Sequence, residues 1–323
     1  MTRREQLDQW LKTALETTDY RVAPLAGDAS FRSYHRVWVG EKSYVVMDAP
    51  PPESPKQFMD IAALLAGEGL TVPVVLGAEL SIGFLLLSDF GDRLYLNELN
   101  NETADALYQT AFAALLKIQA IKADSPNFDR SLLETQRGVF EEWYLQKNKS
   151  IRLSSGLKAI LDPINEQIYQ VIEAQPKVLV HRDYHSRNLM ILAEDSPGIL
   201  DFQDAIIGPI TYDLVSLLQD CYISWPRERV EQWVEAYREQ AVSRGLLSSS
   251  VRPETFLQWF DWTGLQRHLK NLGVFSRLNI RDNKPGYLKS IPQVLHYIFE
   301  TCERYTALKP LQIFLMSLDM ETV

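Results

Sequence analysis

The stretch of sequence that decides the fold is His181-Arg182-Asp183-Tyr184-His185-Ser186-Arg187-Asn188, followed further on by Asp201-Phe202-Gln203-Asp204. Short apolar runs flank both segments: Lys177-Val178-Leu179-Val180 leads into the first, and Leu189-Met190-Ile191-Leu192 and Gly198-Ile199-Leu200 lie between the two. The residues Glu194-Asp195-Ser196-Pro197-Gly198 are typical of a turn. The sequence therefore predicts a hairpin of two short strands, which returns Asp201 to the neighbourhood of Asn188.

The first segment fits the pattern H-R-D-x-x-x-x-N, which is typical of the catalytic loop of kinases, and a metal-binding aspartate follows at the expected distance. Phosphoryl transfer asks a protein chiefly for positioning and for neutralisation of charge. Asp183 is predicted to be the catalytic residue, which orients the acceptor hydroxyl. Asn188 and Asp201 are predicted to hold Mg²⁺, because this hard ion prefers oxygen ligands. The predicted cofactor is therefore Mg²⁺, with ATP as co-substrate.

Composition indicates an ordinary enzyme with a sizeable core, since 46% of the 323 residues are hydrophobic. The formal net charge of −9 disfavours a nucleic-acid partner. Two cysteines, Cys221 and Cys302, make a disulfide framework improbable and favour a reducing compartment. No apolar stretch approaches the ~20 residues of a membrane span. We expect a cytoplasmic protein with no membrane association and no obligate protein partner.

Periodicity divides the chain into a β-rich beginning and a mostly helical remainder. Strands are expected at Tyr34–Val39, Ser43–Met47, Val72–Leu76 and Phe84–Leu87, with a helix inserted at residues 56–68. Later helical patterns cover residues 107–116, 157–172, 212–218, 230–237 and 256–272. The predicted class is α+β, with a nucleotide-binding lobe at residues 1–88 and a catalytic and substrate-binding lobe at residues 89–323.

A loop of small residues lies before the first two predicted strands and is the candidate for covering the phosphates. Small side chains let backbone N–H groups approach phosphate oxygens, and a serine adds a hydroxyl. The connector that begins at Ser88 is suited to a hinge beside the nucleotide. The predicted nucleotide-binding residues are Gly27, Asp28, Ala29, Ser30, Phe31 and Arg32 in the loop, and Leu87, Ser88 and Asp89 at the connector.

On these motifs, together with Gly208 to Asp220, the chain resembles the aminoglycoside phosphotransferase and choline kinase-like superfamily. The resemblance covers nearly the whole chain and implies a protein kinase-like bilobal fold. Within the superfamily the chain is most similar to bacterial anomeric kinases for N-acetylmuramate and N-acetylglucosamine, on the stretches Val46 to Pro51 and Gly264 to Lys270. That resemblance implies transfer of a phosphoryl group from ATP to the C1 hydroxyl of an amino sugar in cell-wall recycling.

One feature departs from the general kinase pattern. The strand after the phosphate loop normally ends in a lysine that pairs the nucleotide phosphates, and here it reads Tyr44-Val45-Val46-Met47-Asp48. Our hypothesis is that Arg32 supplies the missing charge. The alternative is that Arg32 is a surface residue.

The resemblance also implies supporting residues and an acceptor site. Asp213 is expected to brace the catalytic loop through backbone N–H groups, and His181 is expected to pack beneath it. Arg267 is the candidate for holding the lactyl carboxylate of N-acetylmuramate, because arginine binds carboxylates through two donors. The predicted substrate-binding residues are Asp204, Asp220, Trp225 and Arg267, and core packing is the alternative for the aromatic side chains.

Three other functions stay open at this point. Aminoglycoside kinases bind polycations and favour carboxylates around the acceptor, and choline kinases favour an aromatic cage. A nucleotide-binding scaffold without turnover is the alternative from a different class. A protein kinase is disfavoured, because no A-P-E segment follows Asp201. The acceptor and its anomer, the choice of ATP or GTP, the number of Mg²⁺ ions and the oligomeric state stay open.

Overall fold

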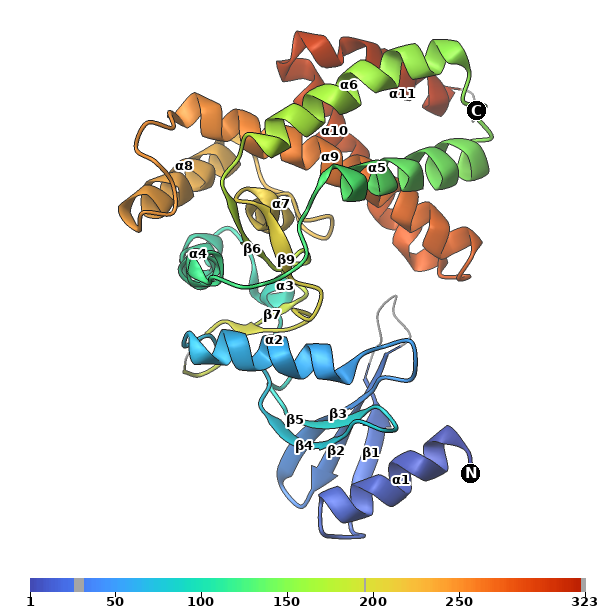
Figure 1. Ribbon diagram of the computed structural model, residues 1–323, viewed down its shortest axis with the longest axis vertical. Coiled ribbons are helices and arrows are strands. Elements are labelled where there is room, and N and C mark those ends of the chain that lie inside the picture. Colours follow the sequence, from blue (N-terminus) through green and yellow to red (C-terminus); the bar gives the residue numbers. More distant parts are fainter. Residues whose placement is uncertain (26–31, 195, 321–323) are drawn as a thin grey trace. The chain divides into compact units, whose positions relative to one another are not determined.

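The computed structural model describes residues 1–25, 32–194 and 196–320 (Figure 1). The chain folds as two compact units. The first unit comprises Met1–Ala114 with Arg187–Asp204, and the second comprises Leu115–Ser186 with Ala205–Val323. The predicted division at residue 88 concerns which residues bind nucleotide and which bind substrate, and it stays a prediction.

The first unit is built on a five-stranded antiparallel sheet with the strand order β1-β2-β3-β5-β4. Two helices and a short third one accompany it, and a further helix begins in this unit and ends in the second. These elements are β1 (Arg21–Pro24), β2 (Ser33–Val39), β3 (Lys42–Asp48), β4 (Val75–Glu79), β5 (Phe84–Ser88), α1 (Arg3–Ala14), α2 (Pro55–Gly67), α3 (Tyr95–Glu98) and α4 (Ala104–Ala120).

Alternation along the strands separates the two faces of this sheet. Val46 of β3 and Phe84 and Leu86 of β5 pack with Leu7 and Leu11 of α1, which lies against the strands in Figure 1. The residues between them therefore belong to the opposite face; they are Val45, Met47, Leu85 and Leu87. Because β2 pairs with β3 through Tyr34↔Met47 and Arg36↔Val45, Tyr34 and Arg36 lie on that opposite face too.

The expected strand at Val72–Leu76 is misplaced by three residues. The strand observed, β4, begins at Val75. Pro73 has no N–H to donate to a neighbouring strand, which disfavours a start before it. Gly77 marks a shift of register against β5. The expected strands at Tyr34–Val39, Ser43–Met47 and Phe84–Leu87 are confirmed with small changes at their ends.

The predicted hairpin downstream of the catalytic loop is also present in the first unit. Its strands are β7 (Leu189–Met190) and β8 (Gly198–Ile199), paired antiparallel. Single bridges tie each strand to the rest of the unit, through Leu94↔Met190 and Thr71↔Gly198. This explains why residues 187–204 fold with the N-terminal sheet.

The second unit is mostly helical, with one two-stranded antiparallel sheet formed by β6 and β9. Its helices include a π-helix and two 3₁₀ helices. The elements are α5 (Arg130–Val139), η1 (Phe140–Asn148), α6 (Ser155–Glu173), β6 (Lys177–Val180), β9 (Ile206–Pro209), α7 (Tyr212–Leu218), α8 (Arg227–Ser243), α9 (Pro253–Ile280), η2 (Pro285–Ser290), α10 (Ile291–Arg304), η3 (Thr306–Leu308) and α11 (Lys309–Met320).

The long helix α9 (orange in Figure 1) packs against η1, α6, α7 and α10. Gly273 permits a close approach of α9 to the end of α5, because a Cβ atom there would lie 2.4 Å from the carbonyl oxygen of Val139. The predicted α+β class is thus confirmed, with an antiparallel sheet near the N-terminus and helices in most of the remainder. No helix in the described part of the chain is long and apolar enough to cross a membrane.

Candidate active site

The catalytic-loop segment begins in the second unit, at the end of a buried strand. Val178, Leu179 and Val180 of β6 are buried, and their pairing with β9 fixes the direction in which the chain leaves the sheet. His181 follows directly and is itself buried, with its ring edge-on to that of Tyr184. Its Nδ1 accepts a hydrogen bond from the backbone N–H of Asp183 (3.3 Å). The histidine therefore packs beneath the loop.

Asp213, at the start of α7, holds the backbone of this loop. The N–H of His181 donates to Oδ2 of Asp213 (2.6 Å), and the N–H of Arg182 donates to Oδ1 (2.9 Å). Arg182 has a φ of 80°, in the left-handed region that disfavours residues with a side chain. Burial raises the pKa of the fully buried Asp213 to about 7, against the opposing effect of the two hydrogen bonds. One carboxylate thus holds a strained turn immediately before Asp183.

Asp220, just after α7, contacts the loop at a second point. The backbone N–H of Ser186 donates to its Oδ2 (3.1 Å), and the hydroxyl of Ser186 donates to the same oxygen. The other oxygen accepts from the N–H of Tyr222 (3.0 Å). Because Asp220 is buried and both of its oxygens are engaged, its position favours holding the loop over contacting a substrate.

Asp183 lies between these two points, beside a positive region on α9. Nη2 of Arg267 is 3.6 Å from its Oδ1, and Lys270 lies one turn further along the helix. Partial desolvation acts to raise the pKa of Asp183, but the charges of Lys270 and Arg267 outweigh it and hold the pKa below the usual range. The side chain is 44% exposed, so water screens part of this attraction. Asp183 is therefore an ionised, accessible hydrogen-bond acceptor at neutral pH.

Arg267, the predicted carboxylate-binding residue, makes contacts with the loop. Its Nη1 donates to the carbonyl oxygen of Arg182 (2.8 Å), and its guanidinium lies over the ring of Tyr212, 5.3 Å from the centroid. The side chain is only 7% exposed. Arg267 is thus placed to orient Asp183. Lys270 is half-buried and makes no hydrogen bond or ion pair with any described residue, and the sequence pattern did not single it out.

The predicted metal ligands lie in the first unit, at the base of the β7–β8 hairpin. The N–H of Leu200 donates to the carbonyl oxygen of Asn188 (2.9 Å), and Nδ2 of Asn188 is 3.4 Å from Oδ2 of Asp201. Asp201 has a φ of 60°, which turns its carboxylate out of the line of the strand. Nε2 of Gln203 donates to its Oδ1 (2.7 Å). The predicted hairpin therefore brings these two side chains together.

This donor set fits Mg²⁺. The amide oxygen of Asn188 and the carboxylate of Asp201 are hard ligands, and Mg²⁺ commonly takes one or two protein ligands and completes its shell with water and phosphate oxygens. Elsewhere in residues 1–25, 32–194 and 196–320, no cluster of three or more His, Cys, Asp or Glu side chains could hold a metal ion. The Asn188–Asp201 pair is therefore the candidate metal site.

Helix α2 holds in place the segment that carries the predicted metal ligand Asp201. The ring of Phe58 packs on that of Phe202, with centroids 4.8 Å apart, and both side chains are buried. Nε2 of Gln57 donates to the carbonyl oxygen of Gln203 (2.8 Å). No local sequence pattern predicts these contacts, because Gln57 and Phe58 are 146 and 144 positions from their partners and look like an ordinary helix start.

The predicted nucleotide-binding connector is fixed by Arg36. Its Nε lies 2.6 Å from Oδ2 of Asp89, and its Nη1 lies 2.7 Å from Asp92. The backbone N–H of Gly91 donates to Oδ1 of Asp89 (2.9 Å), and Ser88 exchanges hydrogen bonds with the backbone of Val74. The side chain of Asp89 is thus engaged in shaping the connector. A nucleotide contact by Leu87, Ser88 or Asp89 stays a prediction.

The remaining predicted nucleotide-binding and substrate-binding residues differ in their exposure and in their contacts. Gly27, Asp28, Ala29, Ser30 and Phe31 lie outside the described residues, whereas Arg32 pairs with Glu53, at 2.7 Å between Nη2 and Oε2. Asp204 is exposed. The ring of Trp225 lies edge-on to that of Trp233, and the guanidinium of Arg229 lies over both rings. The substrate roles of Asp204 and Trp225 stay predictions.

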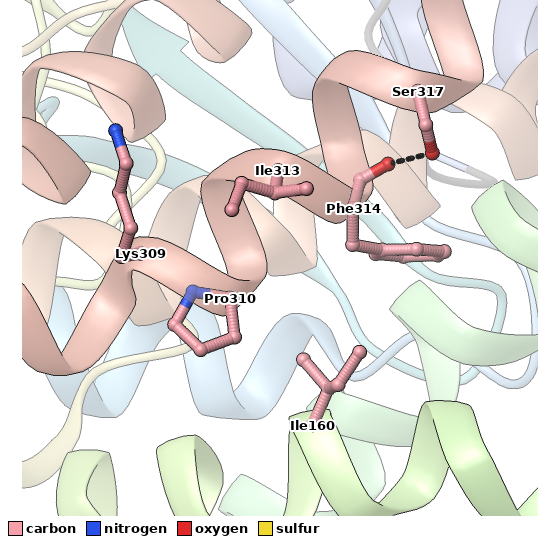
Figure 2. Close-up of a pocket in the computed structure, with 6 residues that line it drawn as sticks. All are labelled: Ile160, Lys309, Pro310, Ile313, Phe314 and Ser317. Carbon is pink, nitrogen blue, oxygen red and sulfur yellow. Dashed lines mark hydrogen bonds between the residues drawn. The ribbon is translucent and has the colours of Figure 1, made fainter.

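A pocket on the second unit is lined by no carboxylate or amide side chain that could orient an acceptor or hold a metal ion. Figure 2 shows its lining, which comes from α6 and α11 and has a cavity volume of about 430 Å³. The lining is mainly apolar, and Ser317 directs its hydroxyl to the carbonyl oxygen of Phe314. None of the residues of the catalytic loop contributes to it, so it is no candidate for the active site.

Comparisons with known proteins agree with this geometry. The sequence model of the phosphotransferase enzyme family matches residues 21–248. A Pseudomonas aeruginosa protein named N-acetylmuramate/N-acetylglucosamine kinase is 40% identical over 97% of this chain and 96% of its own length. Proteins of the same name from Pseudomonas putida (40%, over 94% and 92%) and Neisseria meningitidis serogroup B (38%, over 98% and 96%) are similar to it as well.

Solved structures share the fold at low sequence identity. Choline kinase LicA from Streptococcus pneumoniae superposes with a TM-score of 0.65 at 10% identity, over 91% of this chain and 98% of that one. The aminoglycoside phosphotransferase of the gentamicin–APH(2")-IIa complex gives 0.63 at 15% identity, over 91% and 97%. The family match and the full-length relatives together establish that this chain belongs to the phosphotransferase enzyme family.

Proposed function

We propose that the chain is an ATP-dependent kinase that phosphorylates the C1 hydroxyl of N-acetylmuramate, N-acetylglucosamine or both. The names of the full-length relatives support this acceptor, and the family supports the reaction class. The observation that carries the proposal is the state of Asp183, an ionised carboxylate held by a strained, doubly anchored loop beside two cations. The cellular setting proposed with it is the recycling of cell-wall sugars in the cytoplasm.

Asp183 is proposed to receive the hydrogen bond of the acceptor hydroxyl and to point its oxygen towards the γ-phosphoryl group. A carboxylate with a lowered pKa is a weak base, so its main contribution is orientation, with the proton leaving late in the transfer. Arg267 holds the carbonyl oxygen of Arg182 and the carboxylate of Asp183, so it restricts the positions that Asp183 can take.

Asn188 and Asp201 are proposed to hold Mg²⁺. A bound Mg²⁺ neutralises charge on the phosphate oxygens. Gln203 fixes the rotamer of Asp201, and α2 fixes the segment through Phe58 and Gln57.

The charges beside Asp183 separate the proposed acceptor from the alternatives. An aminoglycoside is a polycation and choline is a quaternary ammonium, and either would be repelled by Arg267 and Lys270. These two charges neither attract nor repel the uncharged N-acetylglucosamine, and they attract the lactyl carboxylate of N-acetylmuramate. Because Arg267 is engaged with the loop, we assign that carboxylate to Lys270 in place of the predicted Arg267. The aromatic pair Trp225–Trp233 is already covered by Arg229, which disfavours it as a choline cage.

The experiment is a measurement of ADP release with Mg²⁺ and a panel of acceptors. We expect turnover with N-acetylmuramate or N-acetylglucosamine above the rate without acceptor, and background rates with kanamycin and choline. Asp183→Asn should reduce the sugar-dependent rate to background while leaving Mg²⁺-ADP affinity unchanged. Turnover only with kanamycin or choline would contradict the proposed acceptor. ADP binding without turnover would favour the non-catalytic scaffold.

A further inference from the structure

The first unit lacks a lysine at the position where kinases use one to pair the nucleotide phosphates. The only lysine of β3 is Lys42, an exposed residue at the start of the strand beside the hairpin turn. On the face of the sheet opposite α1, β3 offers Val45 and Met47. A cation for the polyphosphate must therefore come from another element.

Arg32 is the candidate for such a cation. It immediately precedes β2, the strand whose Tyr34 and Arg36 pair with Met47 and Val45. Its guanidinium pairs with Glu53 at 2.7 Å, and the two side chains are only 9% and 14% exposed. This excludes the alternative that Arg32 is a surface residue, and water screens a pair so enclosed much less than an exposed one.

Glu53 connects this cation to the metal-binding segment. It directly precedes Ser54, the N-cap of α2, whose hydroxyl accepts from the N–H of Gln57 (3.3 Å). Gln57 and Phe58, in the first turn of the same helix, hold Gln203 and Phe202 beside the metal ligand Asp201. Six consecutive residues at one helix start therefore contact both Arg32 and the metal-binding segment, all within the first unit.

We propose that Arg32 is the residue that binds the nucleotide polyphosphate in place of the strand lysine, and that Glu53 is the positioning residue that holds it. This rests on the proposed kinase function and adds the device that places the phosphates. Protein kinases use a lysine on the third strand paired with a glutamate on the following helix. Here the cation is the residue that precedes β2, and the carboxylate is the residue that precedes the N-cap of α2. A guanidinium suits this position, because its five donors can serve a carboxylate at one edge and phosphate oxygens at another.

The test is the affinity for Mg²⁺-ADP and for adenosine, measured by calorimetry without any acceptor. Arg32→Gln should weaken ADP binding about tenfold or more through the loss of charge-assisted hydrogen bonds, and adenosine binding should not change. Arg32→Lys should recover part of the loss. Glu53→Gln should weaken ADP binding by a smaller factor, and the double variant should bind ADP as Arg32→Gln alone does, because Glu53 acts only through Arg32.

Asp48→Asn is the matched control. Asp48 accepts from Nε of Arg3 (2.9 Å) on the α1 side of the same sheet, so this variant also loses a partly buried ion pair of the first unit. Its melting temperature should fall as that of Glu53→Gln does, but its ADP affinity should equal that of the wild type. Wild-type ADP affinity in Arg32→Gln, or equal ADP affinities in Glu53→Gln and Asp48→Asn, would overturn the proposal. The assay contains no sugar, so a wrong acceptor leaves this result unaffected; a wild type that binds ADP no better than adenosine would instead contradict the kinase function itself.

Discussion

Replacing Asp213 with asparagine tests how the catalytic loop is held. The carboxylate accepts two backbone hydrogen bonds, at 2.6 and 2.9 Å, in a fully buried position. Asparagine offers one acceptor oxygen, so its NH₂ group must face the second N–H. An unsatisfied buried donor costs about 1–3 kcal/mol, and the remaining bond loses its charge assistance, worth about a further 1 kcal/mol. The free energy of unfolding should fall by about 2–4 kcal/mol.

The effect on turnover should be larger than the effect on stability suggests. Arg182 has a φ of 80°, a conformation that costs a residue with a side chain about 1–2 kcal/mol. Once one hydrogen bond is lost, the turn can relax and carry Asp183 with it. A displacement of about 1 Å lowers turnover about 100-fold in a reaction that depends on positioning. The nucleotide affinity should not change, since the two hydrogen bonds that Asp213 accepts come from the catalytic-loop backbone of its own unit.

The assay pairs steady-state kinetics with urea unfolding, and Asp261→Asn is the control. Asp261 is also fully buried, and it pairs with Arg227 at 2.7 Å in the same unit. That variant should be destabilised at least as much but keep turnover within about twofold, because none of its contacts involves the loop. If Asp213→Asn loses stability as Asp261→Asn does and keeps its turnover, the bracing role is wrong.

The pH dependence provides an independent check of the same residue. Burial raises the pKa of Asp213 from an ordinary value near 4 to about 7, against the lowering effects of the two backbone hydrogen bonds and of the charge of Arg267. The folded chain then binds this proton more tightly than the unfolded chain, so the contribution of Asp213 to stability is complete below pH about 4 and declines as the pH rises to about 7. Turnover, in contrast, should fall as the pH drops through about 7. A protonated carboxyl accepts the hydrogen bonds of the two N–H groups less well than a carboxylate does. Asp213→Asn should lack that acidic limb.

Further variants test the other parts of the site. Asp183→Asn should lose orders of magnitude in kcat with unchanged ADP affinity, as measured by steady-state kinetics and calorimetry. Asp201→Asn should raise the Mg²⁺ concentration required for half-maximal activity at least tenfold, and unchanged Mg²⁺ dependence would exclude it as a ligand. Lys270→Gln should lower kcat/KM for N-acetylmuramate about tenfold and leave that for N-acetylglucosamine unchanged, whereas an equal loss for both sugars would contradict the assigned carboxylate contact. Phe58→Ala should lower the free energy of unfolding by about 3–5 kcal/mol, and its Mg²⁺ dependence should shift with that of Asp201→Asn.

The sequence predicted those parts of the site that lie close together along the chain. Asn188 and Asp201 could be paired because turn residues and two short apolar runs lie between them. The strand β9 was missed, since Ile206-Ile207-Gly208-Pro209 contains a Gly-Pro pair that is typical of a turn, and only its pairing with β6 makes it a strand.

The contacts that hold the site depend on packing between distant segments. Asp220 looked like a substrate residue because it follows the metal-binding segment and is charged, and only the fold shows that it bonds with Ser186. Arg267 is predicted to bind a carboxylate by residue type, and only the fold shows that its Nη1 donates to the carbonyl oxygen of Arg182. Glu53 follows three prolines and carries no pattern, so its pairing with Arg32 could not be derived from either local sequence.

The most direct test of the central claim is the ³¹P spectrum of the product formed from Mg²⁺-ATP and N-acetylmuramate or N-acetylglucosamine. We expect a new phosphate monoester signal coupled to the anomeric proton of the sugar, formed by the wild type and absent with Asp183→Asn. A product phosphorylated at another hydroxyl would contradict the assignment of the C1 acceptor. If the only phosphorylated product arises from kanamycin or choline, the amino-sugar kinase function is wrong.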